Sequence, residues 1–334
     1  MIHLLKSVLK YLFSTALAAG LLYWAFSSSH LSWEDLLKTF QNADYNWVAV
    51  SLLFSVIAHY LRAVRWGQLL AVMNYKPGNT RTLSAVLIGY FANFLIPRMG
   101  EVTRCGSLQK TASIPFEKSF GTVITERIID LICLGLALLI NIYFELEPLK
   151  NYLFPNLHLP GNTLLVTGIA SAVFVFGLFY VFRTQISETY NKIIQSSKLG
   201  AIIAGWVDGI KSVFLVKNPI LFIFYSLGIW ICYYLNAYVL LLAFPESANL
   251  GLGAAITILV MGSFGMAMPT QGGIGAYHSL VGSTLIYYEI AQSNSAALAT
   301  FFHGTQMVSI LLLGGISFII TLFLPKIDSL EKLQ

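Results

Sequence analysis

The amino-acid sequence predicts an all-α polytopic membrane protein, and three observations support this fold class. Of the 334 residues, 57% are hydrophobic and only 10% are charged, whereas soluble domains carry about 25% charged residues. The mean hydropathy is +0.73. Several apolar runs also reach the roughly 20 residues that a helix needs to cross a hydrocarbon core. A β-barrel would show short segments of alternating polarity instead.

Six apolar runs are long enough to be full transmembrane helices. They cover residues 8–27, 46–64, 120–144, 163–182, 219–243 and 297–323. The first run lacks a clean small-residue cleavage site, so we expect a span rather than a signal peptide. Segments 32–43 and 198–216 look amphipathic and are expected to lie on the membrane interface. No change of composition marks a domain boundary, so residues 1–334 are expected to form a single integral membrane domain.

The Lys and Arg residues are distributed unevenly between the two sides of this topology. With the N-terminus inside, the outer segments hold only Lys38 and Lys150. The cytoplasmic segments hold Lys6, Lys10, Arg62, Arg65, Lys76, Arg81, Lys110, Lys118, Arg183, Lys192, Lys198, Lys211, Lys217, Lys326 and Lys332. The positive-inside rule then predicts a multi-pass cell-membrane protein with both termini cytoplasmic. The net charge of +5 is therefore no evidence for a nucleic-acid partner.

The segment 82–118 is predicted to form a re-entrant hairpin. Its first limb, TLSAVLIGYFANFLI (82–96), is too short to cross comfortably, and IPRMGEVTR (96–104) then brings in Arg98, Glu101 and Arg104. By the charge distribution, the segment enters and leaves on the cytoplasmic side, with its tip at 97–101. Non-helical backbone at membrane depth must be buried in protein or line a wet cavity, so the tip should face other helices.

The segment 251–291 repeats this pattern from the outside. GLGAAITILVMGSFGMAMP (251–269) descends, TQGGIG (270–275) breaks the helix, and residues 276–291 return. The two tips share a weak pattern, Pro-x-x-Gly-Glu at 97–101 and Pro-x-x-Gly-Gly at 269–273. Similar tips that enter from opposite sides suggest an inverted repeat, as in many transporters.

Both tips carry groups that favour an anion. A helix leaving each tip presents free N–H groups and a positive dipole end near mid-membrane. The glycines of GGIG allow close approach of a ligand to the backbone. Arg98 and Arg104 add guanidinium groups that can fork onto a phosphate. These features predict a phosphate-sized anion inside a membrane protein, and a lipid headgroup is the abundant candidate.

Further charges lie in TERIID (125–130) and in HYLRAVRW (59–66). Glu126 and Asp130 share a helix face, and Arg127 lies about 100° away from Glu126. Such charges usually face the bundle interior in pairs, so the two acids either pair with nearby arginines or complete a headgroup site and shuttle a proton. Arg62 and Arg65 are either ordinary positive-inside anchors beside an interfacial Trp66 or the place where anionic lipid is collected from the inner leaflet.

No cofactor and no metal are expected. His59, His278 and His303 lie in apolar runs without the HExxH-type spacing of a zinc site, so buried, satisfied histidines are the favoured interpretation. The cysteines give neither metal spacing nor a disulfide framework; they are Cys105, Cys133 and Cys232.

The ordered set RAVRW (62–66), IPRMGEVTR (96–104), ERIID (126–130) and PTQGGIG (269–275) resembles the lysylphosphatidylglycerol synthase transmembrane-region family of flippase-like domain proteins. The resemblance spans nearly the whole chain. Some members of that family fuse this domain to a soluble aminoacyl-transferase that makes lysyl-phosphatidylglycerol, which the membrane part is held to flip. That soluble domain is not found here, so we expect a stand-alone member that does not synthesise such a lipid.

The resemblance also implies a set of headgroup-binding residues. The family often has an acidic residue shortly after the GGIG turn, where this chain has Tyr277 and His278. If that acid holds a cationic aminoacyl group, a different headgroup is expected here. The binding residues carried over from the family are Arg98, Glu101, Arg104, Glu126, Arg127, Asp130, Gly272, Gly273 and Gly275. We add His278, which departs from the family's pattern, as a further expected binding residue.

The leading functional hypothesis is flippase- or scramblase-like translocation of a phosphate-containing lipid headgroup, anionic, aminoacylated or polyprenyl-linked. No GxxxxGK[ST] motif is found, so movement would be passive or coupled to protons. One alternative is a secondary transporter for a small solute or ion. Another is an integral-membrane lipid-linked transferase that uses Glu101, Glu126 and Asp130. The expected partners are membrane phospholipid or a lipid-linked substrate, with homo-oligomerisation left open.

Overall fold

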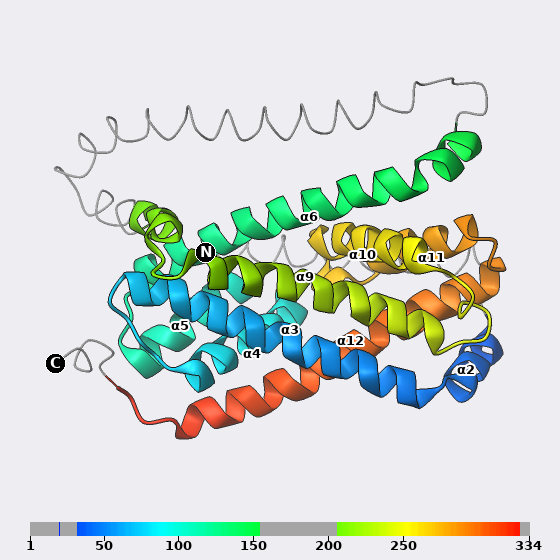
Figure 1. The fold of residues 1–334 in the computed structure, drawn as a ribbon. Coiled ribbons are helices and arrows are strands. Elements are labelled where there is room, and N and C mark those ends of the chain that lie inside the picture. Colours follow the sequence, from blue (N-terminus) through cyan, green and yellow to red (C-terminus); the bar gives the residue numbers. More distant parts are fainter. Residues whose placement is uncertain (1–19, 21–31, 154–205, 328–334) are drawn as a thin grey trace.

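The computed structural model describes Gly20, residues 32–153 and residues 206–327, and the regular structure in these ranges is helical. Residues 206–211 form a helical turn that leads into the 3-10 helix η1 (Ser212–Leu215). The other elements are α2 (Trp33–Asn42), α3 (Tyr45–Val72), α4 (Asn79–Leu95), α5 (Gly100–Ala112), α6 (Phe116–Leu153), α9 (Pro219–Leu242), α10 (Leu252–Ala267), η2 (Gln271–Gly273), α11 (Ala276–Tyr287) and α12 (Gln292–Phe323). Figure 1 shows their arrangement.

Among the described helices, α3, α9 and α12 are long and apolar enough to cross a membrane. Their starts follow local rules: the Asp44 side chain caps α3, and Asn218 caps α9 just before Pro219. The predicted spans 46–64, 219–243 and 297–323 fall on these helices. The predicted span 120–144 lies within α6. The spans 8–27 and 163–182 fall on residues that, apart from Gly20, lie outside the described ranges, so the count of six remains a prediction.

Helices α4 and α5 form a tight hairpin around a break at residues 96–99. A Cβ on Gly89 would lie 2.8 Å from the Gly100 carbonyl oxygen, so the two backbones are in contact. The Asn93 side chain accepts a hydrogen bond from the Gly100 N–H at 2.6 Å, which satisfies one free donor of α5. Arg98 adopts the left-handed region with a φ of 61°. The helix break expected near 97–101 is therefore present.

Helices α10 and α11 form a second hairpin, which turns through η2. Gly262 and Gly265 of α10 face Tyr277 of α11, and a Cβ on either glycine would lie within 2.9 Å of that tyrosine. The turn is rich in left-handed backbone, with φ values of 58°, 79° and 83° at Gly272, Gly273 and Gly275. Glycine suits these positions because it has no Cβ to clash.

The turns of the two hairpins meet in a contact that is partly exposed, because Arg98 and residues 266–269 lie at the surface. The expectation that the first tip faces other helices is therefore met only in part. In Figure 1 the α4–α5 and α10–α11 hairpins come from opposite ends of the long helices. The Arg98 guanidinium donates a hydrogen bond to the Ala267 carbonyl oxygen at 2.9 Å. A Cβ on Gly272 would lie 3.6 Å from the Phe94 ring. These contacts place the two breaks side by side. That each hairpin is re-entrant stays a prediction.

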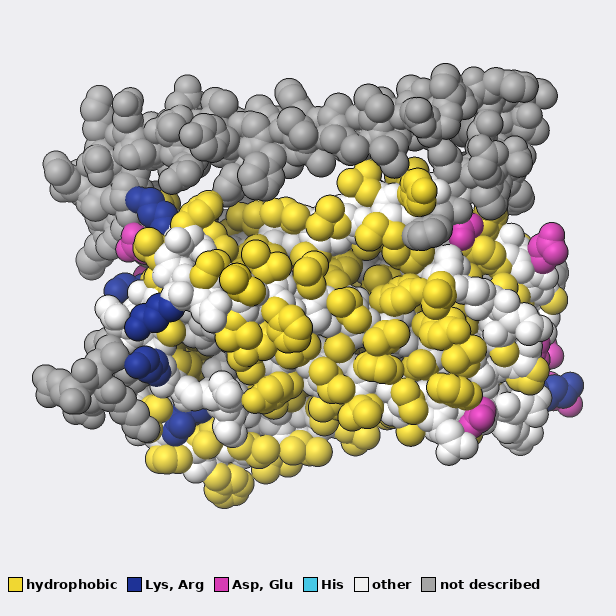
Figure 2. Space-filling view, in the orientation of Figure 1, with side chains coloured by type: hydrophobic (Ala, Val, Ile, Leu, Met, Phe, Trp, Pro, Cys, Tyr) yellow, Lys and Arg dark blue, Asp and Glu magenta, His cyan; other side chains and the backbone are white. Residues whose placement is uncertain are grey.

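The surface has a broad apolar middle and charged ends. Figure 2 shows hydrophobic side chains across the centre of one face, with most of the Lys and Arg at one end and most of the Asp and Glu at the other. Exposed side chains such as Leu53, Phe224 and Phe318 belong to the long helices. The short helix α2 begins with a reciprocal Ser32–Asp35 capping box and buries none of its residues. Of segment 198–216, only residues 206–216 are described.

Candidate functional site: a buried charged network

Two arginines of α3 form the first side of a buried charged network. Arg62 and Arg65 are three residues apart and therefore share a helix face. They are 3% and 0% exposed. Arg62 lies ten residues before the end of α3, or about 15 Å along the helix axis. Charges buried this completely are costly unless they are paired.

Helix α6 supplies the paired carboxylates. Arg62 Nη1 lies 2.7 Å from Asp130 Oδ2, and Arg65 Nη2 lies 2.9 Å from Asp130 Oδ1. Arg65 Nη2 also lies 3.3 Å from Glu126 Oε1. The prediction that Glu126 and Asp130 share one helix face is confirmed, because both carboxylates contact Arg65.

Helix α5 contributes Arg104, which is held between a carboxylate and an indole ring. Arg104 Nη2 lies 2.8 Å from Glu126 Oε2, and its guanidinium carbon lies 4.6 Å from the centre of the Trp66 ring. This geometry is typical of a cation–π contact. Trp66, for which one alternative was an interfacial position, is fully buried and donates to the Thr122 hydroxyl at 2.8 Å. The interfacial alternative is therefore wrong for this residue, because its indole packs against other helices.

The edges of the network reach α9 and the outer side of α6. Arg62 Nη2 donates to the Tyr233 hydroxyl at 3.2 Å, and Arg65 Nη1 donates to the Ser226 hydroxyl at 3.4 Å. Arg127 lies 3.3 Å from Asp130, and its side chain is 43% exposed. Sequence analysis missed Ser226 and Tyr233. Their signal was two polar groups seven residues apart, and so on one face, in an otherwise apolar span.

Arg98 and Glu101 lie at the first hairpin turn, apart from this network. The exposed Arg98 binds the Ala267 carbonyl oxygen. Glu101 is partly buried in the first turn of α5, where a carboxylate suits the helix dipole. No ion pair links either residue to another described residue. Arg98 and Glu101 therefore lie outside the ion pairs of the network, whereas Glu126 links Arg104 to Arg65 of α3.

A histidine cluster lies at the second hairpin turn. His303 Nε2 is 2.9 Å from the Gly272 carbonyl oxygen, which can only accept a hydrogen bond. Tyr277 stacks on the His303 ring at 4.8 Å, and the His278 ring meets it edge-on at the same distance. The Gly275 N–H donates to His278 Nδ1 at 3.2 Å. Among the described residues, no group of three His, Cys, Asp or Glu side chains is placed to hold a metal.

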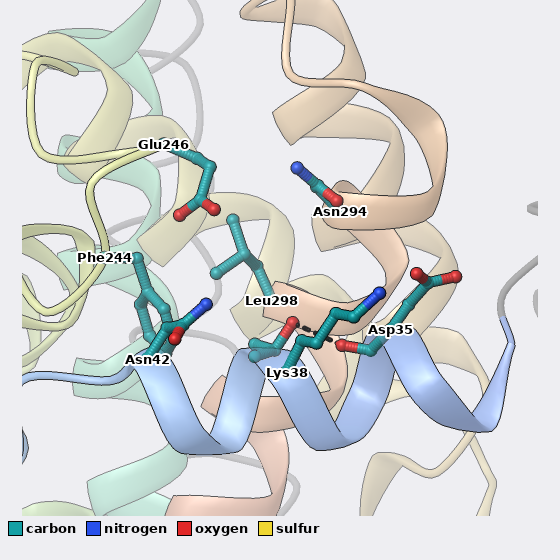
Figure 3. Close-up of a pocket in the computed structure, with 8 residues that line it drawn as sticks. Asp35, Lys38, Asn42, Phe244, Glu246, Asn294 and Leu298 are labelled. Atoms are coloured by element: carbon teal, nitrogen blue, oxygen red, sulfur yellow. Dashed lines mark hydrogen bonds between the residues drawn. The ribbon is translucent and has the colours of Figure 1, made fainter.

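A small polar pocket of about 130 Å³ lies away from the network, where α2 meets the start of α12. Figure 3 shows several of its side chains, including the Glu246 carboxylate and the Asn294 amide. Asp35, Lys38 and Asn42 of α2 form another part of its wall. None of the residues that line it was predicted as a site residue. The buried network, with four arginines, remains the stronger candidate for binding an anion.

Comparison with known sequences identifies the family. The family described as lysylphosphatidylglycerol synthase TM region matches residues 9–314. The chain belongs to this family. The resemblance inferred from the ordered motifs is thereby confirmed, and the chain is an integral membrane protein of a multi-pass family.

Two archaeal relatives are membrane proteins. The chain is 22% identical to the UPF0104 membrane protein MJ1595 of Methanocaldococcus jannaschii, over 81% of this chain and 83% of the relative. It is 26% identical to the UPF0104 membrane protein PH1989 of Pyrococcus horikoshii, over 56% and 52%. The glycosyltransferase AglD of Haloferax volcanii is 26% identical over 31% of this chain and 17% of its own length. No solved structure gives a significant match.

Proposed function

We propose that this protein translocates a phosphate-containing lipid headgroup, anionic, aminoacylated or polyprenyl-linked, across the cell membrane. The observation that supports this proposal is the arginine-rich network buried among helices long enough to span a bilayer. Intramembrane charges are expensive and are usually functional. Arginine is also the side chain best suited to fork onto phosphate.

The proposed topology has six spans and two re-entrant hairpins that enter from opposite sides. Its support is the pair of helix breaks that meet through Arg98 and Ala267, between hairpins that come from opposite ends of the bundle (Figure 1). The gathering of Lys and Arg at one end of the molecule supports a cytoplasmic orientation for that end (Figure 2). In this orientation both termini are cytoplasmic.

In the proposed mechanism, the network substitutes for the water that a headgroup loses in the membrane. Moving a polar headgroup through bare hydrocarbon is costly because its hydrogen bonds to water are lost. Guanidinium groups held in place by Glu126 and Asp130 would donate hydrogen bonds to the headgroup. The two hairpin turns would then separate this site from the opposite leaflet.

A lipid-linked transferase is less well supported by the same contacts. Such an enzyme would use Glu126 and Asp130 as bases or metal ligands, yet both carboxylates are engaged by arginines. The named glycosyltransferase relative matches over only 17% of its own length. A solute transporter would share the proposed topology, so the experiment must separate solute from lipid.

The test is lipid exchange in reconstituted vesicles that contain a fluorescent analogue of phosphatidylglycerol or of phosphatidylcholine. The wild type should accelerate loss of the inner-leaflet phosphatidylglycerol signal to an external quencher, and Arg65→Gln should abolish this. Arg81→Gln is the matched control, because Arg81 binds the Pro325 carbonyl oxygen outside the network. Exchange no faster than in protein-free vesicles for any phosphate lipid would overturn the proposal.

A further inference from the structure

The charged network contains more positive than negative charge. Its ion pairs join four guanidinium groups to two carboxylates, which leaves a formal surplus of two positive charges. Arginine does not deprotonate in proteins, so the surplus does not disappear by titration. The nearest further acid on α5, Glu101, makes no ion pair with a described residue. The members are Arg62, Arg65, Arg104, Arg127, Glu126 and Asp130.

All four arginines also have an unused hydrogen-bond donor. The Nε atoms of Arg62, Arg65, Arg104 and Arg127 are buried and have no hydrogen-bond partner among the described residues. As whole residues, Arg62, Arg65 and Arg104 are 3%, 0% and 4% exposed. Buried charge without a counter-charge, and buried donors without acceptors, both destabilise a fold. An anion that supplied charge and acceptor oxygens together would satisfy both.

We propose that the headgroup bound here carries two negative charges, as a doubly ionised lipid phosphomonoester does. This inference rests on the proposed function and specifies its substrate class. A phosphodiester has one charge and two free oxygens, so it would neutralise only half of the surplus. A terminal phosphate has two charges and three acceptor oxygens. Arg127, 43% exposed, is the member of the network through which such a group would first make contact.

The experiment measures binding of three lipids with the same acyl chains to the purified protein by native mass spectrometry. The lipids are phosphatidic acid, phosphatidylglycerol and phosphatidylcholine, with inorganic phosphate as the non-lipid probe. At about pH 8 a phosphomonoester is doubly ionised, because its second pKa is about 6. Phosphatidic acid should bind about tenfold more tightly than phosphatidylglycerol, the equivalent of one charge-assisted hydrogen bond. Phosphatidylcholine and inorganic phosphate should bind weakly.

A change of network charge provides the decisive variant. Arg127→Gln lowers the surplus of positive charge by one and removes only the 3.3 Å contact with Asp130. It should therefore reduce the ratio of the affinity for phosphatidic acid to the affinity for phosphatidylglycerol. Arg127→Lys keeps the charge and should retain the preference. Arg81→Gln, outside the network, should also retain it, and thermal melting checks that each variant is folded.

The outcomes separate this inference from the proposed function. Equal binding of phosphatidic acid and phosphatidylglycerol, both lost in Arg65→Gln, would overturn the double charge and leave lipid translocation standing. The double charge would likewise be overturned if Arg127→Gln weakened the binding of both lipids by the same factor. Tight, arginine-dependent binding of inorganic phosphate without any lipid preference would overturn both proposals in favour of a solute site.

Discussion

At the scale of single residues, Glu126 is the centre of the charged network. Its two carboxylate oxygens face guanidinium groups from different helices, Arg65 of α3 and Arg104 of α5. The side chain is fully buried. Removing one partner of a buried ion pair typically costs about 3–5 kcal/mol, because the remaining charge stays desolvated. Glu126 therefore stabilises the contact of three helices as well as the candidate site.

We expect Glu126→Gln to lower the free energy of unfolding by about 3 kcal/mol. The double variant with Arg104→Gln should lose less free energy of unfolding than the two single variants together, because each single change leaves the other charged partner buried and unpaired. Denaturant or thermal unfolding in detergent measures the free energy of unfolding of the wild type, the two single variants and the double variant. If the two single losses added exactly in the double variant, the 2.8 Å contact between Arg104 and Glu126 would contribute no interaction energy.

Arg98 combines two features that one pair of variants can separate. It has a left-handed φ of 61° and a hydrogen bond to the opposite hairpin. Arg98→Gly removes the guanidinium but suits the backbone, whereas Arg98→Ala removes the guanidinium and keeps the backbone strain. The two variants should impair lipid exchange equally, and Arg98→Ala should have the lower melting temperature. Full exchange activity in both variants would mean that the contact between the hairpin turns is not needed.

At the scale of elements, glycine contacts hold each hairpin together. Gly89 of α4 meets the Gly100 backbone so closely that a methyl group has no space. We expect Gly89→Ala to destabilise the protein by about 1–3 kcal/mol through overpacking. Gly106→Ala on α5 is the control, because its Cβ would meet no atom within 4 Å and alanine favours a helix. Thermal melting of both variants is the measurement; equal stability would contradict the tight packing.

At the scale of the whole molecule, the two hairpins define a testable topology. Lys110 lies in the last turn of α5, and Glu246 lies between α9 and α10; both are exposed. In the proposed topology, Lys110→Cys should react with a membrane-impermeant thiol reagent only from the cytoplasmic side. Glu246→Cys should react only from outside. The native cysteines are buried and should give little background. Labelling of both sites from one side would exclude opposed hairpins.

Many residues of the candidate site could be predicted from the sequence, but the contacts between them could not. The breaks at 97–101 and 270–275 were predictable because proline, glycine and charge interrupt apolar runs. The shared face of Glu126 and Asp130 followed from helical periodicity. The joining of Arg62 and Arg65 to those acids, more than sixty residues away, could not be read from spacing. Nor could the separation of Arg98 from Arg104, since the helix break between them changes the direction of the chain.

By itself, the sequence determined that the chain is helical, apolar and a member of its family, because hydropathy, helix breakers and ordered motifs are local properties. It also determined which charges lie in apolar surroundings. Only the tertiary structure decided which charges meet. Burying Arg62, Arg65 and Arg104 beside two carboxylates depends on how α3, α5 and α6 pack, and ion pairing in a low-dielectric interior depends on distances of a few ångströms that no one-dimensional pattern specifies.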